Sequence, residues 1–123
     1  GKSLYSLGRY KESLDYHKRR LEIANKISDR LGKSHALRNL GRAYFKMGKH
    51  QQSIKYCSES IEISKSIGDR RGKGIAMQYI GEIYLSSGNN EQAKEYLKAA
   101  LTIFQDISWM KNKYEVELLL ENH

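Results

Sequence analysis

The chain has 123 residues, of which 39% are hydrophobic and 29% are charged, and this is enough for one domain with a buried core. No apolar run approaches the roughly 20 residues that a membrane-spanning helix needs, and no signal-peptide pattern stands at the start, so we expect a cytoplasmic protein that does not enter a membrane. The single cysteine, Cys57, excludes an internal disulfide.

The net charge of +8 is concentrated in the first half of the chain. Residues 1–55 hold 14 Lys and Arg against 4 Asp and Glu, whereas residues 56–123 hold 8 against 10. The basic run Lys18, Arg19 and Arg20 could contact phosphate groups. Stacking aromatic residues are not interleaved along this run. We therefore interpret it as a solvated helix face rather than a nucleic-acid site.

An internal repeat of about forty residues organises the sequence. Residues in register across three copies are Gly8, Gly48 and Gly88; Tyr16, Tyr56 and Tyr96; and Leu21, Ile61 and Leu101. A repeat of this kind buries its core between neighbouring units. We expect a single domain made of a partial repeat over residues 1–30, repeats over 31–70 and 71–108, and a covering helix over 109–121.

The composition favours helices separated by glycine turns, because the chain has no proline and ten glycines. Apolar residues recur at spacings of three and four, which is the pattern of one helix face. The expected helices, in chain order, span residues 10–27, 31–47, 51–67, 71–87, 90–106 and 110–121. In the last of these, Trp109, Val116 and Leu120 share one face and are expected to cover the open end of the array.

Glycine and aspartate mark the expected helix ends. Gly48 and Gly68 stand where a left-handed turn ends a helix. Asp29 and Asp69 stand where a side-chain oxygen can cap the free amides of the next helix.

Two glycines inside helices indicate close packing. Gly41 and Gly81 each cost about 1 kcal/mol relative to alanine in a helix interior. Their recurrence at one repeat position implies that something bulky presses against them, and Tyr44 and Tyr84 are the expected neighbours.

These residues resemble the tetratricopeptide repeat in its longer form of about forty residues per unit. The residues that carry the resemblance are Leu37, Asn39, Leu40, Gly41, Arg42, Ala43, Tyr44, Met47, Gly48, Ser53, Ile54, Tyr56 and Ile61, followed by residues 67–74. It covers the chain to about Ile107. The long form is similar to repeats of the animal scaffold that links cortical G proteins to the mitotic spindle, of kinesin light chains and of bacterial signalling proteins.

The resemblance implies an all-α fold of antiparallel helix pairs stacked into a right-handed solenoid. It also implies a protein-interaction module that binds peptides on the concave face formed by the first helix of each pair. The family commonly has Asn after the inner glycine, whereas this chain has Lys2, Arg42 and Glu82 there. Because the first copy begins at that glycine, we expect further repeats before Gly1 in the native protein.

A basic strip with one aromatic residue is the candidate binding face of residues 31–47. Arg38, Arg42 and Phe45 share a face at helical spacing, with His35 and Lys46 at its edges. Arginine can hold a carboxylate through two hydrogen bonds. The matching strip on the next inner helix is apolar with one acid and consists of Ile75, Gln78, Glu82, Leu85 and Ser86. We therefore predict a partner segment that is acidic at one end and apolar at the other; the alternative is that Arg38 and Arg42 are solvated and pair with neighbouring acids.

No catalytic, metal or cofactor pattern is found. Glycine-rich phosphate loops and nucleophile elbows are absent, and His35 and His50 lack a second ligand at helical spacing. His17 is interpreted as a packed core histidine and Cys57 as a small buried residue. We expect no enzyme activity in this segment. The alternative function is a structural segment that self-associates head to tail or by swapping.

Overall fold

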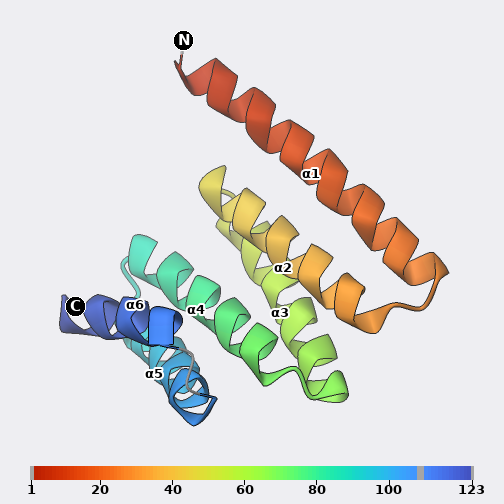
Figure 1. Cartoon of the computed structure of the whole chain (residues 1–123). Coiled ribbons are helices and arrows are strands. Elements are labelled where there is room, and N and C mark those ends of the chain that lie inside the picture. The colour runs from red at the N-terminus through yellow and green to blue at the C-terminus, as the bar shows by residue number, and fades with distance from the viewer. Residues whose placement is uncertain (1, 108–109, 123) are drawn as a thin grey trace.

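The computed structural model describes residues 2–107 and 110–122, and this part of the chain forms six α-helices (Figure 1). They are α1 (Lys2–Lys26), α2 (Arg30–Lys46), α3 (His50–Ile67), α4 (Arg70–Ser86), α5 (Asn90–Asp106) and α6 (Met110–Glu121). In the described ranges, no helix is long and apolar enough to cross a membrane.

Each helix packs against the next, and α2 also contacts α4. Figure 1 shows the helices following one another across the molecule from α1 to α6. In the predicted repeat register, α2/α3 and α4/α5 are the two full pairs, so we call α2 and α4 the inner helices and α3 and α5 the outer helices. The predicted all-α repeat solenoid is confirmed.

The predicted turn and cap residues lie at the helix ends. Gly48, Gly68 and Gly88 have φ values of 77°, 76° and 80°. These angles fall in the left-handed region, where glycine meets no side-chain clash. Asp29 and Asp69 accept hydrogen bonds from the backbone N–H groups three residues later, at 2.9 and 3.0 Å. The helix boundaries therefore follow from local chemistry.

The first helix differs from the prediction. The helix was expected to begin at Tyr10, and Gly8 stands in register with the turn glycines Gly48 and Gly88. Instead α1 runs without a break from Lys2 to Lys26. Glycine permits the helical as well as the left-handed conformation. The short segment before Gly8 gains more by continuing the helix, because elongation adds one hydrogen bond for each residue fixed.

The inner glycines are indeed closely packed, but the neighbours are not those predicted. A Cβ atom at Gly41 would lie 2.5 Å from Cys57 Sγ, and one at Gly81 would lie 2.8 Å from Leu97 Cδ2. The expectation for Tyr44 and Tyr84 was wrong, because residues three positions apart on one helix cannot press on each other's backbone as the facing helix does. The glycines allow each outer helix to approach its inner helix.

The recurring tyrosines stack within each full repeat. The rings of Tyr44 and Tyr56 lie 5.4 Å apart with planes 2° from parallel, and those of Tyr84 and Tyr96 lie 5.7 Å apart at 29°. Tyr16 is 57% exposed. The sequence and the course of α1 explain the difference, because the position in register with Tyr44 and Tyr84 is Leu4, and residues 2–8 continue α1 instead of folding back over Tyr16.

The layer of side chains between the first turns of the inner helix and the facing outer helix is polar in the α2/α3 pair and apolar in the α4/α5 pair. In α2/α3, Ser34 Oγ lies 2.9 Å from both Ser60 Oγ and Ser64 Oγ, and all three serines are buried. In α4/α5, the equivalent position Gly74 faces Phe104, whose Cε1 would be 2.8 Å from an added Cβ. The ring of Phe104 fills the space that hydroxyl groups occupy one repeat earlier.

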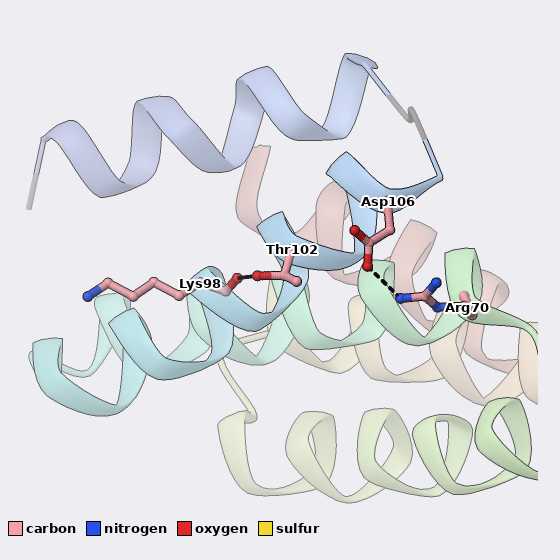
Figure 2. A network of polar contacts seen from close by, with 4 residues as sticks. All are labelled: Arg70, Lys98, Thr102 and Asp106. Atoms are coloured by element: carbon pink, nitrogen blue, oxygen red, sulfur yellow. Dashed lines mark hydrogen bonds and ion pairs between the residues drawn. The ribbon is translucent and has the colours of Figure 1, made fainter.

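An arginine at the start of each inner helix reaches the end of the following outer helix. Arg30 Nη2 donates to Ser66 Oγ at 2.5 Å, and Arg70 Nη2 pairs with Asp106 Oδ2 at 2.9 Å (Figure 2). Both contacts are exposed and therefore add little stability.

The final helix covers the end of the array. Val116 is fully buried against the core that contains Leu97 and Phe104, and Leu120 packs beside it. Trp109, the other residue expected on this face, lies outside the described residues.

Candidate functional site

A groove of about 360 Å³ lies between the two inner helices and α6. The residues that line it are Arg42, Phe45, Lys46, Ile75, Gln78, Tyr79, Glu82 and Glu115. We call this surface the inner groove. It has contributions from α2, α4 and α6, so the repeat stacking itself creates it.

A second hollow adjoins the inner groove and is more apolar. It has a volume of about 350 Å³ and shares Phe45 and Glu82 with the inner groove. Leu85, Ser86 and Leu119 complete its lining. We call this surface the apolar hollow. It places aliphatic side chains from α4 and α6 next to the aromatic ring supplied by α2.

The α2 side of the inner groove is basic. Arg42 and Lys46 are one helical turn apart and both are exposed. The Arg42 guanidinium carbon lies 5.7 Å from the centroid of the Tyr79 ring, which is a cation–π distance. Among the ion pairs of the described chain, none joins Arg42 or Lys46 to a carboxylate. Both cations can therefore meet an incoming anion.

The opposite side of the inner groove is acidic. Burial raises the pKa of the half-buried Glu82 carboxyl, the nearby Glu115 raises it further, and Arg42 opposes the shift. Gln78 is buried, and its Nε2 donates a hydrogen bond to Glu115 Oε2 at 3.1 Å. The amide of Gln78 thus anchors the carboxylate that α6 brings to the groove.

Two of the predicted site residues do not line either surface. Arg38 is only 9% exposed, and its Nη1 lies close to Gly72 at the start of α4. Burial lowers the pKa of this guanidinium. His35 is half-buried beside it, and burial followed by the charge of Arg38 lowers the pKa of the imidazole. The sequence pattern placed both residues with Arg42, but the crossing of α4 over α2 covers this end of the strip.

Six of the eight predicted residues are brought together. Arg42, Phe45, Lys46, Gln78 and Glu82 line the inner groove, and Leu85 lines the apolar hollow.

Sequence reasoning missed the contribution of α6. Glu115 and Leu119 are four residues apart and flank the buried Val116, so a helical wheel of the covering helix could have found them. Tyr79 was also missed; it lies on the α4 face that carries Gln78 and Glu82.

Cys57 and His17, whose side chains could react or bind a metal ion, lie in surroundings that indicate a structural role. Cys57 is buried, as predicted, and burial raises the pKa of its thiol to about 12. His17 is half-buried with its ring 5.4 Å from that of Tyr16. The part of the chain that the structure describes contains no cluster of three or more His, Cys, Asp or Glu residues suited to a metal ion.

The fold and the groove define a class of α-helical repeat protein with a surface formed by its inner helices. The chain matches a family model described as tetratricopeptide repeat over residues 1–56 and 36–106, and it therefore belongs to the tetratricopeptide repeat family. No curated protein matches the chain. Repeats of this family generally mediate protein–protein interaction and form a non-enzymatic fold.

Proposed function

We propose that the chain is a protein-interaction module that binds an acidic, partly apolar peptide segment in the inner groove and the apolar hollow. The observation that carries this proposal is the pair of exposed cations, Arg42 and Lys46, directly beside Phe45 and the aliphatic lining of the hollow. Membership of an interaction family supports it. The domain division and the cytoplasmic setting expected from the sequence are part of the proposal.

Each side of the site would have a distinct task. Arg42 can hold a carboxylate through two parallel hydrogen bonds, and its contact with Tyr79 limits the freedom of the guanidinium before binding. Phe45, Leu85 and Leu119 offer an apolar contact area for one large side chain of the partner. The charged contact would fix the register of the segment and the hollow would contribute buried apolar area.

The test is a peptide-array screen of the parent chain beside the Arg42→Glu/Lys46→Glu variant. Both side chains are exposed, so we expect the variant to keep its native circular dichroism spectrum and to lose at least tenfold in affinity for the acidic segments that the parent retains. Lys94→Glu, which changes an exposed lysine of the outer helix α5, is the matched control. Equal binding by the parent and the double variant would show that the inner groove is not the site.

A second candidate function is self-association. Apolar side chains are exposed at both ends of the array: Ile23, Ile27 and Leu31 near the junction of α1 and α2, and Tyr114 and Leu118 on α6. Such surfaces can bind head to tail, which produces open filaments when the rotation does not close. Light scattering over a concentration series separates the candidates, because only self-association predicts a mass that rises with concentration.

A further inference from the structure

The inner groove carries unpaired charges of both signs on facing walls. Arg42 and Lys46 come from α2, whereas Glu82 comes from α4 and Glu115 from α6. Although these groups line one groove, none of the four belongs to an ion pair of the described chain. Opposite charges that line one groove without pairing can each take a partner of opposite sign.

The acidic wall combines a half-buried carboxylate, Glu82, with an exposed one, Glu115, that a hydrogen bond holds in place. Glu82 is half-buried, and Glu115 is oriented by the buried amide of Gln78 at 3.1 Å. Two carboxylates close together repel each other, and a cation placed between them removes that repulsion. Lysine or arginine of a bound segment is the group that supplies such a cation.

We propose that the inner groove recognises a bipolar segment, in which an acidic residue binds Arg42 and Lys46 and a basic residue binds Glu82 and Glu115. This inference rests on the proposed function and narrows its partner class from an acidic segment to one that carries both charges. Charge complementarity on both walls fixes the direction of the segment, because reversing it would place like charges together. An acidic segment without a basic residue satisfies only the α2 wall.

The charges on the two walls of the inner groove would favour a segment of low net charge. A purely acidic segment would approach Glu82 and Glu115, and like-charge contact reduces its affinity. A purely basic segment would meet the same penalty from Arg42 and Lys46. Specificity thus comes from rejecting the two single-sign alternatives as well as from binding the bipolar one.

The test begins with selection from a random peptide library displayed on phage, using three forms of the full chain. Peptides selected by the parent are expected to carry both Asp or Glu and Lys or Arg. Peptides selected by the Glu82→Gln/Glu115→Gln variant should keep the acidic residue and lose the basic one. Peptides selected by the Arg42→Glu/Lys46→Glu variant should lose the acidic residue.

The second step measures affinity by fluorescence anisotropy with a peptide from the parent selection and its analogue in which Lys or Arg is replaced by Gln. The Glu82→Gln/Glu115→Gln variant should bind the selected peptide about tenfold more weakly than the parent does, and should bind the analogue about as well as the parent does. Glu59→Gln, on the exposed side of α3, is the control and should change neither affinity.

The outcomes separate the two proposals. Selection of acidic peptides with no enrichment of Lys or Arg would overturn the bipolar inference and leave the proposed function standing. If the Glu82→Gln/Glu115→Gln variant binds the selected peptide as tightly as the parent does, the bipolar inference would also be overturned and the proposed function would stand. Failure of the parent to select any peptide would overturn both.

Discussion

The contact between Gly41 and Cys57 makes a quantitative prediction about how closely the helices of one repeat must approach. In Gly41→Ala the new methyl carbon would lie 2.5 Å from Cys57 Sγ and 3.1 Å from the carbonyl oxygen of Ser53. The carbonyl belongs to the backbone of α3 and the sulfur is fully buried, so the clash is relieved only by a shift of α3 or by rotation of the Cys57 side chain within a packed core. Overpacking of this kind costs about 1 to 3 kcal/mol.

The helix propensity of alanine opposes this cost. Replacing glycine by alanine inside a helix contributes about 1 kcal/mol of stability. We therefore expect Gly41→Ala to lower the free energy of unfolding by about 1 kcal/mol in net terms. The measurement is a urea titration followed by circular dichroism, with a fall in Tm of roughly 3 to 6 °C as the thermal counterpart.

A double-mutant cycle isolates the steric cause. In Gly41→Ala/Cys57→Ala the sulfur is gone and only the contacts with backbone atoms of α3 remain, so Gly41→Ala should cost less stability in the Cys57→Ala background than in the parent. Gly48→Ala is the matched control. Gly48 has a φ of 77° with nothing within 4 Å of an added Cβ, so its loss of about 1 kcal/mol should persist in the Cys57→Ala background. If Gly41→Ala is more stable than the parent, or if Cys57→Ala fails to rescue it, the packing argument is wrong.

Three further predictions concern single residues. Asp69→Ala removes the acceptor of the 3.0 Å bond from the Gly72 N–H and should cost about 1 kcal/mol in urea unfolding, whereas Asp69→Asn should retain most of the stability. Glu82→Gln should stabilise the chain at neutral pH, because folding raises the pKa of Glu82 and so penalises its charged form. This gain in the free energy of unfolding should vanish as the pH falls below the pKa of an unfolded glutamate. A difference in stability that does not depend on pH would contradict this prediction. The Cys57 thiol, with a pKa of about 12, should react with iodoacetamide only after unfolding; labelling of the native chain at the rate of a free cysteine would show that the site opens.

Most of the fold could be predicted because its signals are local. Apolar spacing, glycine turns and Asp caps each act within a few residues, and they located α2 to α6 to within about one residue at each end, in keeping with the usual uncertainty of helix boundaries. Gly8 shows the limit of this reasoning. It stands in register with Gly48 and Gly88, yet glycine allows both a turn and a continuous helix. Tertiary packing of the residues before Gly8 decides between the two conformations.

The site could be predicted in part, because a helical wheel shows which residues share a face but not which face remains open. Arg42 and Arg38 are one turn apart on α2, but α4 crosses over Arg38 and leaves Arg42 exposed. Glu115 was missed for a related reason. Its place in the groove depends on how α6 lies against α4, and nothing in the repeat register reports that angle.

The serine layer of α2/α3 limits which helices can pair during folding. Helices in a repeat protein resemble one another, so an inner helix could in principle join the wrong outer helix one unit away. If α4 took the place of α2 against α3, Gly74 would face Ser60 and Ser64 and leave their buried hydroxyl groups without the Ser34 partner, at about 1 to 3 kcal/mol for each unsatisfied group. If α2 paired with α5, Ser34 would meet the ring of Phe104. The difference between the two layers therefore favours the native pairing of helices over pairing with a helix of the neighbouring repeat.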